Sequence, residues 1–491
     1  MKLAFPLRRA APALPSMYAA PGRGGKASSV IVTIVGLFLA VFFGLAAAVL
    51  PWQYLVGLFG LPVLLLVGAA MPTVLFVAAL LLLFGVMPEF IMAALPLGGA
   101  TLRPAELVLI FCFVVVMARV ILARKDILTP LRPLRWPLLI LICGLLIGFV
   151  KGKLLSNNAL ALADARQFVG WLALPIGVWF GLAHPGRLQR IVVGVALLAA
   201  TLMILQLGLG VQLIFGFRGA ENLSKDFSDV TRSAIGGGLF FLGFAAYRLF
   251  LHACDGDRWR WTSLLGSLIA IGGIVASFNR AVWAGFAVGA LLLLIFKPRT
   301  KRSALVPFVL LLTLVSVGVA GLLVAKPRTA DALMERVASI KEEGRRGSSL
   351  GFRFDENQQA LAALRQNPFA GVGMGGEYKR VYRQLSTAGS FDTEIAFIHN
   401  GYLSLWLKLG FFGAVLPLGL LIAGVFVSRA TRQGEGRLGA FAGVMTLILL
   451  LISMLTSADL STSSGTAAIA SILAIMLVAK ERSRAGAERS S

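Results

Sequence analysis

Long apolar stretches with few charges recur along most of this 491-residue chain, and they constrain its fold more than any other feature. A helix needs about 20 consecutive apolar residues to cross the hydrocarbon core of a membrane. The candidate stretches lie near 29–50, 52–70, 73–93, 104–123, 136–150, 166–183, 188–210, 234–253, 262–278, 281–296, 304–325, 401–427, 438–457 and 464–480. The sequence therefore predicts an all-α polytopic membrane protein with about 14 transmembrane helices, and 12 is the nearest alternative.

The composition supports this class and excludes two others. Hydrophobic residues make up 58% of the chain and charged residues only 14%. A soluble enzyme is about half apolar and a quarter charged, and a disordered chain is more polar still. The net charge of +24 would suggest nucleic acid in a soluble protein. In a membrane protein, basic residues collect in cytoplasmic loops, so no nucleic-acid partner is predicted.

Basic residues also predict the orientation of the chain. If the N-terminus is cytoplasmic, the connections on that side hold most of them, among them Arg8, Arg9, Lys26, Arg124, Lys125, Arg132, Arg187, Arg190, Lys301, Arg302, Arg432 and Arg437. The opposite short connections hold far fewer, including Arg103, Lys151, Lys153 and Arg218. The positive-inside rule then places both termini in the cytoplasm and requires an even number of spans.

One connection is much longer than the rest and lies on the non-cytoplasmic side. It contains helical stretches at about Thr329–Glu343 and Arg353–Gln366, followed by the Gly-rich turn Gly371–Gly376. A loop of this length is uncommon unless it is functional or disordered. We predict a small folded cap over the bundle. The predicted organisation is a disordered cytoplasmic tail at 1–28, membrane bundle at 29–325, periplasmic loop domain at 326–400, last membrane helices at 401–480 and a cytoplasmic tail at 481–491.

His399 is the most distinctive candidate for chemistry. It closes the long loop and immediately precedes the apolar stretch 401–427, at the non-cytoplasmic surface. Imidazole exchanges a proton near neutral pH without special tuning, so His399 is a candidate acid or base, with a structural role as the alternative. Gly410 lies eleven residues further, close to three helical turns, and Gly413 about one turn beyond. Both would let a neighbouring helix approach closely and fix the helix that presents His399.

Arginines near the outer face form a second candidate group. Arg280 and Arg166 each stand at the outer start of an apolar stretch, and Arg353 lies in the long loop. Arg280 and Arg166 could snorkel to lipid phosphates, and Arg353 could simply be neutralised by the nearby carboxylates of Asp355, Glu356 and Glu377. Alternatively, the three arginines could together bind an anionic substrate group, since the guanidinium fork pairs bidentately with phosphate. Lys408 could likewise snorkel outward. The sequence contains no Walker loop, no G-x-S-x-G motif and no outer Asp, Glu and His cluster typical of a metal site. No metal and no cofactor are predicted, and Cys112, Cys143 and Cys254 receive no role.

Several motifs resemble the O-antigen ligase and O-antigen polymerase superfamily. His399-Asn400 followed by Gly410 and Gly413 resembles its His-Asn…Gly-x-x-Gly signature. The stretch from Arg353 through Asn367-Pro368-Phe369-Ala370-Gly371-Val372-Gly373 is similar to the family segment that precedes it. Ser277-Phe278-Asn279-Arg280 resembles the family's Ser-x-x-Arg. Arg166 resembles a looser Arg-x-x-x-Leu position, where Gly170 replaces the Leu. The resemblance covers about 160 to 430.

The resemblance implies a multi-pass enzyme of the bacterial inner membrane with a GT-C-like fold. Such an enzyme takes a glycan from undecaprenyl pyrophosphate at the periplasmic face, without a metal, and passes it to the lipid A core or to a second lipid-linked glycan. It implies that His399 is catalytic, that Arg280, Arg166, Arg353 and Asn400 bind substrate, and that Gly410, Gly413, Gly371 and Gly373 are structural. Membrane lipids are further partners.

Three alternatives stay open at this point. An O-antigen or exopolysaccharide polymerase would share these motifs with a ligase. An enzyme that glycosylates protein Ser or Thr would usually carry an additional C-terminal periplasmic domain. A transporter of lipid-linked sugars would predict paired halves and charges in mid-membrane, and no internal repeat is visible. The sequence does not specify the glycan, the acceptor or the oligomeric state.

Overall fold

A computed structural model describes most of the chain. The described residues are 70–86, 95–97, 100–158, 160–214, 221–222, 231–232, 235–255, 260–296, 305–325, 331, 334, 349–383, 390–395, 398–431 and 434–490. The predicted tail 1–28 and the first predicted span at 29–50 lie outside them, as does nearly all of 52–70. The predicted helix Thr329–Glu343 is also almost wholly outside.

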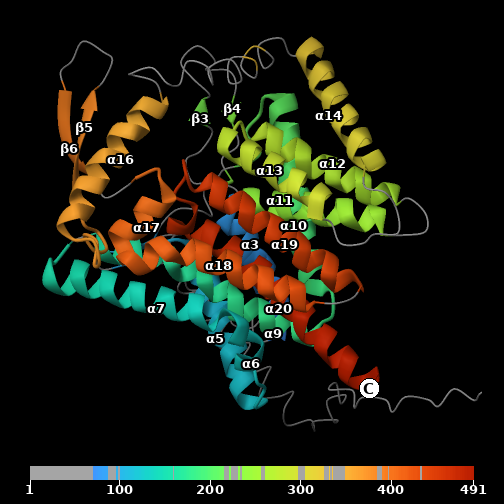
Figure 1. Ribbon diagram of the computed structural model, residues 1–491, viewed down its shortest axis with the longest axis horizontal. Helices are drawn as coiled ribbons and strands as arrows, with labels where there is room; N and C mark the ends of the chain where they lie inside the picture. Colours follow the sequence, from blue (N-terminus) through green and yellow to red (C-terminus); the bar gives the residue numbers. More distant parts are fainter. Residues whose placement is uncertain are drawn as a thin grey trace, which may run out of the picture. The chain divides into compact units, whose positions relative to one another are not determined.

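The described part is mainly helical, which confirms the predicted class (Figure 1). The first helices are α3 (Pro72–Leu83), α5 (Pro104–Leu122), α6 (Leu128–Leu131), α7 (Arg135–Phe149), α8 (Ala161–Arg166), α9 (Ala173–Ala183) and α10 (Arg187–Leu209). These are followed by α11 (Gly238–Cys254), α12 (Trp261–Ala276), α13 (Arg280–Phe296), α14 (Leu305–Ala325), α16 (Ser349–Gln366), α17 (Gly401–Leu409), α18 (Phe411–Ala430), α19 (Gly434–Ser453) and α20 (Ser463–Ser490).

Short antiparallel hairpins interrupt this helical pattern, so the all-α prediction was incomplete. They pair β1 (Leu95–Leu97) with β2 (Ala100–Leu102), β3 (Glu221–Asn222) with β4 (Thr231–Arg232), and β5 (Tyr378–Arg383) with β6 (Ser390–Ile395). The longest belongs to the long loop, where Tyr378 pairs with Ile395 and Arg383 with Ser390. Strand β5 contains Tyr378, Val381 and Tyr382 among basic residues, and aromatic and β-branched side chains favour a strand.

Six helices among the described residues are long and apolar enough to cross a membrane, so the protein is a multi-pass membrane protein. They are Pro104–Leu122, Leu128–Leu155, Arg187–Leu209, Phe411–Ala430, Glu435–Ser453 and Ser463–Glu488. Five shorter apolar helices accompany them, at Pro72–Leu83, Gly238–Cys254, Trp261–Ala276, Arg280–Phe296 and Leu305–Gly318. The total of 14 spans stays a prediction.

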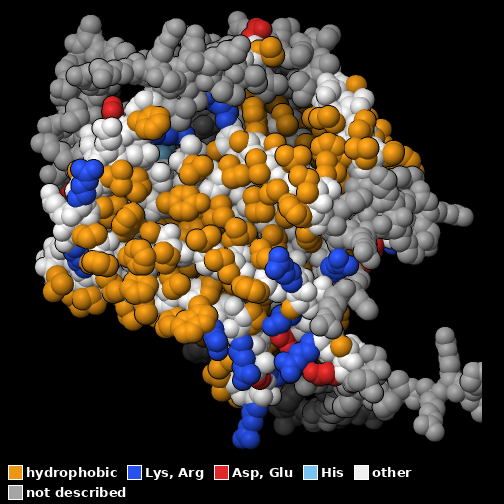
Figure 2. All heavy atoms as spheres, in the orientation of Figure 1, with side chains coloured by type: hydrophobic (Ala, Val, Ile, Leu, Met, Phe, Trp, Pro, Cys, Tyr) orange, Lys and Arg blue, Asp and Glu red, His pale blue; other side chains and the backbone are white. Residues whose placement is uncertain are grey.

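The surface carries a broad apolar belt, as expected for contact with lipid tails. On the face drawn in Figure 2, hydrophobic side chains form this belt, and Lys and Arg with some Asp and Glu gather beyond its lower border near α6 and the end of α20. The apolar helices described above expose large hydrophobic side chains, among them Ile121, Leu146, Leu291 and Phe426. In water such a surface would aggregate, whereas in a bilayer it is the favoured one.

The predicted span 166–183 is not one regular helix. A 3-10 segment, Gln167–Leu172, separates α8 from α9. A side chain at Gly170 would collide with Thr466 and with the backbone of Ser463 in α20. Gly170 therefore allows α20 to approach closely, which explains the departure from the Leu of the similar family.

The predicted span 401–427 is also interrupted, and the expectation of one continuous helix there was wrong. The short helix α17 ends at Leu409, and Gly410 has φ +68° and ψ −162°, values that favour glycine. A side chain at Gly410 would collide with the carbonyl of Phe369, and one at Gly413 with the carbonyl of Leu405. The two glycines thus permit a sharp turn between α17 and α18 rather than packing along one helix face.

Contacts with α19 and the residue that follows it bring the starts of α13 and α17 to the same end of the bundle. Helix α13 packs antiparallel along α19, because Gly285 faces Leu449 and Gly289 faces Met445. This register places the start of α13 beside the end of α19. The N–H of Gly401 donates to the carbonyl of Met454 at 2.7 Å, so α17 begins at the same end.

Candidate functional site

His399 lies directly before the N-cap residue of α17, and the start of that helix holds it in place. Asn400 is the N-cap residue, and its side-chain oxygen accepts hydrogen bonds from the N–H groups of Tyr402 and Leu403, both at 3.1 Å. This is the usual way to satisfy the first amides of a helix. The structure therefore gives Asn400 a capping role, while substrate binding by this residue stays a prediction.

A buried carboxylate from the long loop meets His399. The imidazole Nδ1 lies 3.1 Å from Glu356 Oε2 and 3.4 Å from Oε1, and the backbone N–H of His399 donates to the same Oε2 at 3.2 Å. The Glu356 side chain is 0% exposed and that of His399 is 30% exposed. When the Glu356 carboxylate is ionised it can only accept, and in that state Nδ1 carries the proton while Nε2 of the neutral ring keeps a lone pair. This pair can act as an oriented general base.

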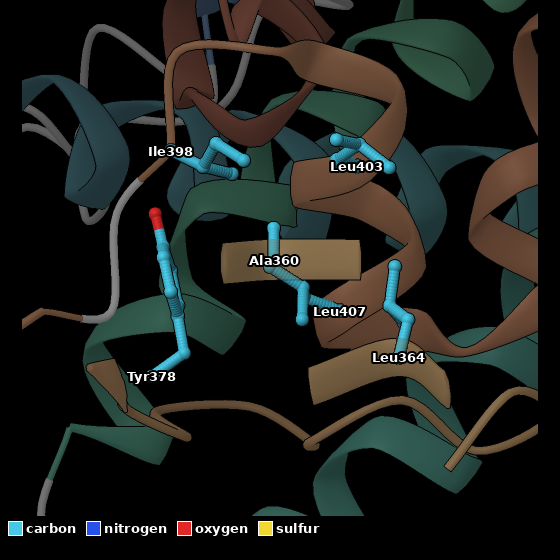
Figure 3. Packing of buried hydrophobic residues seen from close by; sticks show 6 residues of the cluster. All are labelled: Ala360, Leu364, Tyr378, Ile398, Leu403 and Leu407. Carbon is cyan, nitrogen blue, oxygen red and sulfur yellow. The ribbon is translucent and has the colours of Figure 1, made fainter. Parts of the chain in front are cut away.

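Helix α16 carries Glu356 to the histidine by packing on α17. Ala360 and Leu364 follow Glu356 at intervals of four, so all three share one face of the helix. Figure 3 shows Ala360 and Leu364 against Leu403 and Leu407, with Ile398 and Tyr378 completing the cluster. The apolar cluster thus holds the carboxylate of Glu356 beside the imidazole of His399. Arg353 lies three residues before Glu356, nearly one turn earlier on the same side.

Arg280 begins α13 after an unusual turn. Phe278 is a buried non-glycine residue with φ +50°, a strained conformation of the kind that clusters at functional sites. The hydroxyl of Ser277 donates to Ile274 O at 2.6 Å, and Asn279 Oδ1 accepts from the N–H of Val282 at 3.3 Å. Because α13 starts where α19 ends, Arg280 and His399 lie at the same end of the bundle.

Figure 2 shows Lys and Arg side chains beside a histidine in a hollow at the upper border of the hydrophobic belt. Convergence of Arg280 and Arg353 on His399 around one substrate stays a prediction.

Arg166 lies in a buried charge cluster. Its Nε is 3.3 Å from Glu106 Oε2, and Glu106 also accepts from the hydroxyl of Ser463 at 2.8 Å and from the N–H of Arg103 at 3.1 Å. Burial and the nearby guanidinium of Arg166 lower the pKa of Arg103 to about 10, against the opposite influence of Glu106. The cluster therefore concentrates positive charge where α5, α8 and α20 meet. Substrate binding by Arg166 stays a prediction.

Lys408 does not snorkel, because its ammonium group is buried in an ion pair. Its Nζ lies 2.6 Å from Asp164 Oδ1 and 3.3 Å from Gln167 Oε1. The other oxygen of Asp164 accepts from the N–H of Gly375 at 2.8 Å. This pair connects α8, α17 and the Gly-rich turn.

The Gly-rich turn is docked by its backbone. The N–H groups of Val372 and Gly373 both donate to Leu407 O, at 2.8 and 3.0 Å, and that of Met374 donates to Gly148 O at 2.9 Å. Lys151 Nζ donates to Gly371 O. Gly371 and Gly373 have φ +64° and +87°, and a side chain at either would collide with neighbouring backbone. The structural role predicted for them thus has a geometric basis, although the full role of the turn stays a prediction.

We expect Lys408→Met to destabilise the protein strongly. Removing one partner of a buried pair leaves an uncompensated charge, which costs about 3–5 kcal/mol in the free energy of unfolding. The double variant Asp164→Asn with Lys408→Met should recover most of this loss, because both charges are then gone. Thermal unfolding in detergent measures the stability of the single and the double variant. Lys153→Met, in a lysine that is partly exposed and near Asn157, is the matched control. A Lys408→Met variant as stable as wild type would contradict the buried pair.

A further carboxylate, that of Asp459, is partly buried between α19 and α20. Asp459 accepts from the hydroxyls of Ser453 at 2.7 Å and Ser457 at 2.9 Å. Burial raises the pKa of Asp459, and the two hydroxyls oppose this rise. In the adjoining segment, the hydroxyls of Ser461 and Ser404 are 2.9 Å apart, which ties this junction to α17.

Sequence reasoning missed Glu356 and the Asp164–Lys408 pair. From the sequence alone, Glu356 is only a possible neutraliser of nearby arginines. A signal was present, because Glu356 shares the face of Ala360 and Leu364, and a carboxylate on an apolar helix face needs a partner. For Asp164 and Lys408 the only hint was a lone lysine inside an apolar stretch.

The fold and these contacts define a class of protein: a multi-pass membrane protein with a candidate acid–base pair at one end of its helical bundle. Residues 265–418 match a family model described as O-antigen ligase, which confirms the resemblance to the O-antigen ligase superfamily. The matched region contains Arg280, Arg353, Glu356, His399 and Gly410, while Arg166 lies outside it.

Part of the chain is also similar to a curated protein. The chain is 25% identical over 166 residues to an uncharacterized protein of Haemophilus influenzae. The match covers 32% of this chain and 41% of that relative. The chain thus spans about two fifths of the length of the curated relative that it matches.

Proposed function

We propose that the protein transfers a glycan from undecaprenyl pyrophosphate to an acceptor hydroxyl, as an O-antigen ligase with the lipid A core as acceptor. The observation that carries this proposal is the contact between the buried Glu356 and His399 at one end of the bundle, inside the region that matches the ligase family. We place this end at the periplasmic face of the bacterial inner membrane. The positive-inside bias supports cytoplasmic termini and, with the stretches at 29–50 and 52–70, about 14 spans in a GT-C-like arrangement.

His399 acts as the base in the proposed step. The acceptor hydroxyl attacks the anomeric carbon while Nε2 takes its proton, and the bond from that carbon to the pyrophosphate oxygen breaks. Undecaprenyl pyrophosphate leaves with the electron pair. Because the hydroxyl attacks directly from the face opposite this leaving group, the anomeric centre is inverted. Glu356 keeps the proton on Nδ1 and stabilises the imidazolium that forms, as an orienting carboxylate does for a catalytic histidine.

Cationic groups stabilise the departing pyrophosphate. Arg280 at the start of α13, Arg353 on α16 and Arg166 near Glu106 are the proposed donors. Guanidinium groups suit a diphosphate because they offer two parallel N–H donors. At the border of the apolar belt, water screens these charges less than in bulk solvent, so their effect on the developing charge is larger.

A transfer assay tests the proposal. Purified protein in liposomes, supplied with undecaprenyl-pyrophosphate-linked glycan and lipid A core, should yield glycan on the core, and EDTA should leave the rate unchanged. Cells that lack the protein should accumulate long lipid-linked polymer. Accumulation of single lipid-linked repeats would instead indicate a polymerase, with a second glycan as acceptor. Loss of transfer in EDTA would contradict the metal-independent reaction.

We expect Arg280→Lys to lower turnover by about 10²–10³-fold, the usual effect of removing a donor to the developing charge. Lysine keeps the charge and loses the planar fork, so the result separates bidentate binding from simple charge. Initial rates in the transfer assay measure the effect. Arg365→Lys, in the exposed last turn of α16, is the matched control and should retain wild-type rates. Equal rates for both variants would contradict bidentate binding by Arg280.

A further inference from the structure

A large cavity opens at the end of the bundle away from His399. Its volume is 1060 Å³, and it lies between the end of α9, the start of α10, the start of α19 and residues 475–487 of α20. Arg482 in its wall follows Ser463 by 19 residues on α20, which is about 28 Å along the helix. Ser463 bonds Glu106 near the candidate active site, so the cavity is a separate feature.

The lining of this cavity changes from apolar to polar along α20. Leu188, Ile475 and Val478 form an apolar part, and Arg190, Arg482 and Ser483 form a polar part. Helix α20 has 28 residues and is about 42 Å long, whereas the hydrocarbon core is about 30 Å thick. Its last turns therefore extend past the apolar belt, toward the border where Figure 2 shows charged side chains near the C-terminal end. The cavity thus spans the transition from hydrocarbon to headgroup region.

The charge of the cavity favours an anion. Arg190 and Arg482 come from two different helices, and Arg482 donates to the carbonyl of Gly181, which holds it at the wall. The carboxylate in the lining is that of Glu435, which lies 3.7 Å from Arg248 Nη2 and 3.5 Å from His252 Nδ1. The two arginines outnumber this carboxylate in the lining, and Arg248 beside Glu435 adds further positive charge.

We propose that this cavity binds an anionic membrane phospholipid, with the phosphate between Arg190 and Arg482 and the acyl chains along Ile475 and Val478. A soluble phosphate ester would use the two arginines but not the apolar part. A zwitterionic lipid would use the apolar part but would gain little from the arginines. Basic pockets between helices at a membrane border bind anionic headgroups in this way.

Native mass spectrometry of the full chain in detergent tests the proposal. Phosphatidylglycerol and phosphatidylcholine with the same acyl chains are the probes. Wild-type protein should retain phosphatidylglycerol preferentially. The double variant Arg190→Gln with Arg482→Gln should bind it about 30-fold more weakly, as expected for two cations near a charged surface. The control Arg187→Gln with Arg484→Gln changes neighbouring arginines on the same two helices, outside the lining, and should bind as wild type.

A second variant keeps the proposal testable if loss of the Arg482 bond impairs folding. A side chain at Gly486, in the cavity wall, would meet open space, so Gly486→Phe narrows the cavity and retains both arginines. It should also lose phosphatidylglycerol. Equal binding by wild type and Gly486→Phe would overturn the proposal. So would equal loss in the test and control double variants, equal binding of the two lipids, or binding of glycerol phosphate as tight as that of the intact lipid.

Discussion

Replacement of His399 by alanine should lower turnover by about 10²–10⁴-fold, the contribution of a general base, while the lipid-linked donor still binds. Glu356 cannot take the proton from the acceptor in place of the imidazole, because its carboxylate is buried behind the ring. Single-turnover rates in liposomes and donor binding, measured separately, check both parts of this expectation.

The control for this experiment is His184→Ala. His184 is the residue directly after α9. Its ring packs against that of Phe180 rather than against a carboxylate. It should retain activity. If His399→Ala keeps near-normal turnover, the assignment of the base is wrong, whatever the protein transfers.

Glu356→Gln should be nearly as damaging, with turnover lowered by about 10²–10⁴-fold. A carboxylate accepts from Nδ1, whereas a carboxamide can donate to it and so favours the tautomer with the proton on Nε2. In that tautomer Nε2 cannot accept the proton of the acceptor, and loss of this kind reaches about 10⁴-fold in hydrolases with an oriented histidine. Initial rates at saturating donor measure the effect.

The neighbouring carboxylate offers a matched control. Asp355 is exposed on the same helix, so Asp355→Asn changes the charge of α16 by the same amount without touching His399. It should keep wild-type turnover. Comparable losses in both variants would show that the charge of the loop matters and would remove the orienting role of Glu356.

Much of the helical architecture was predictable, because apolar stretches and breaking residues are local signals. Helix α16 ends at Gln366, directly before Asn367-Pro368, as expected for a residue before proline. The interruptions after Arg166 and at Gly410 were not predicted. Hydropathy is the same for one long helix and for two helices with a turn, and only the contacts of Gly170 with α20 and of Gly410 with Phe369 make the turn necessary.

The candidate site was predictable in part for a similar reason. His399 was found because its position at the start of an apolar stretch is visible in the sequence. Its partner Glu356 lies 43 residues earlier, and their meeting depends on the packing of α16 against α17. Lys408 was interpreted as a snorkelling residue because its distance from Asp164, 244 residues, gave no local indication of a pair.

The sequence alone therefore determined that this chain lies in a membrane as a helical bundle and which imidazole stands at its surface. Both follow from hydropathy and side-chain chemistry, which are properties of single segments. Only the tertiary structure decided which carboxylate meets which cation. Burial makes an unpaired charge costly, so each charged group is placed by partners that come from distant parts of the chain.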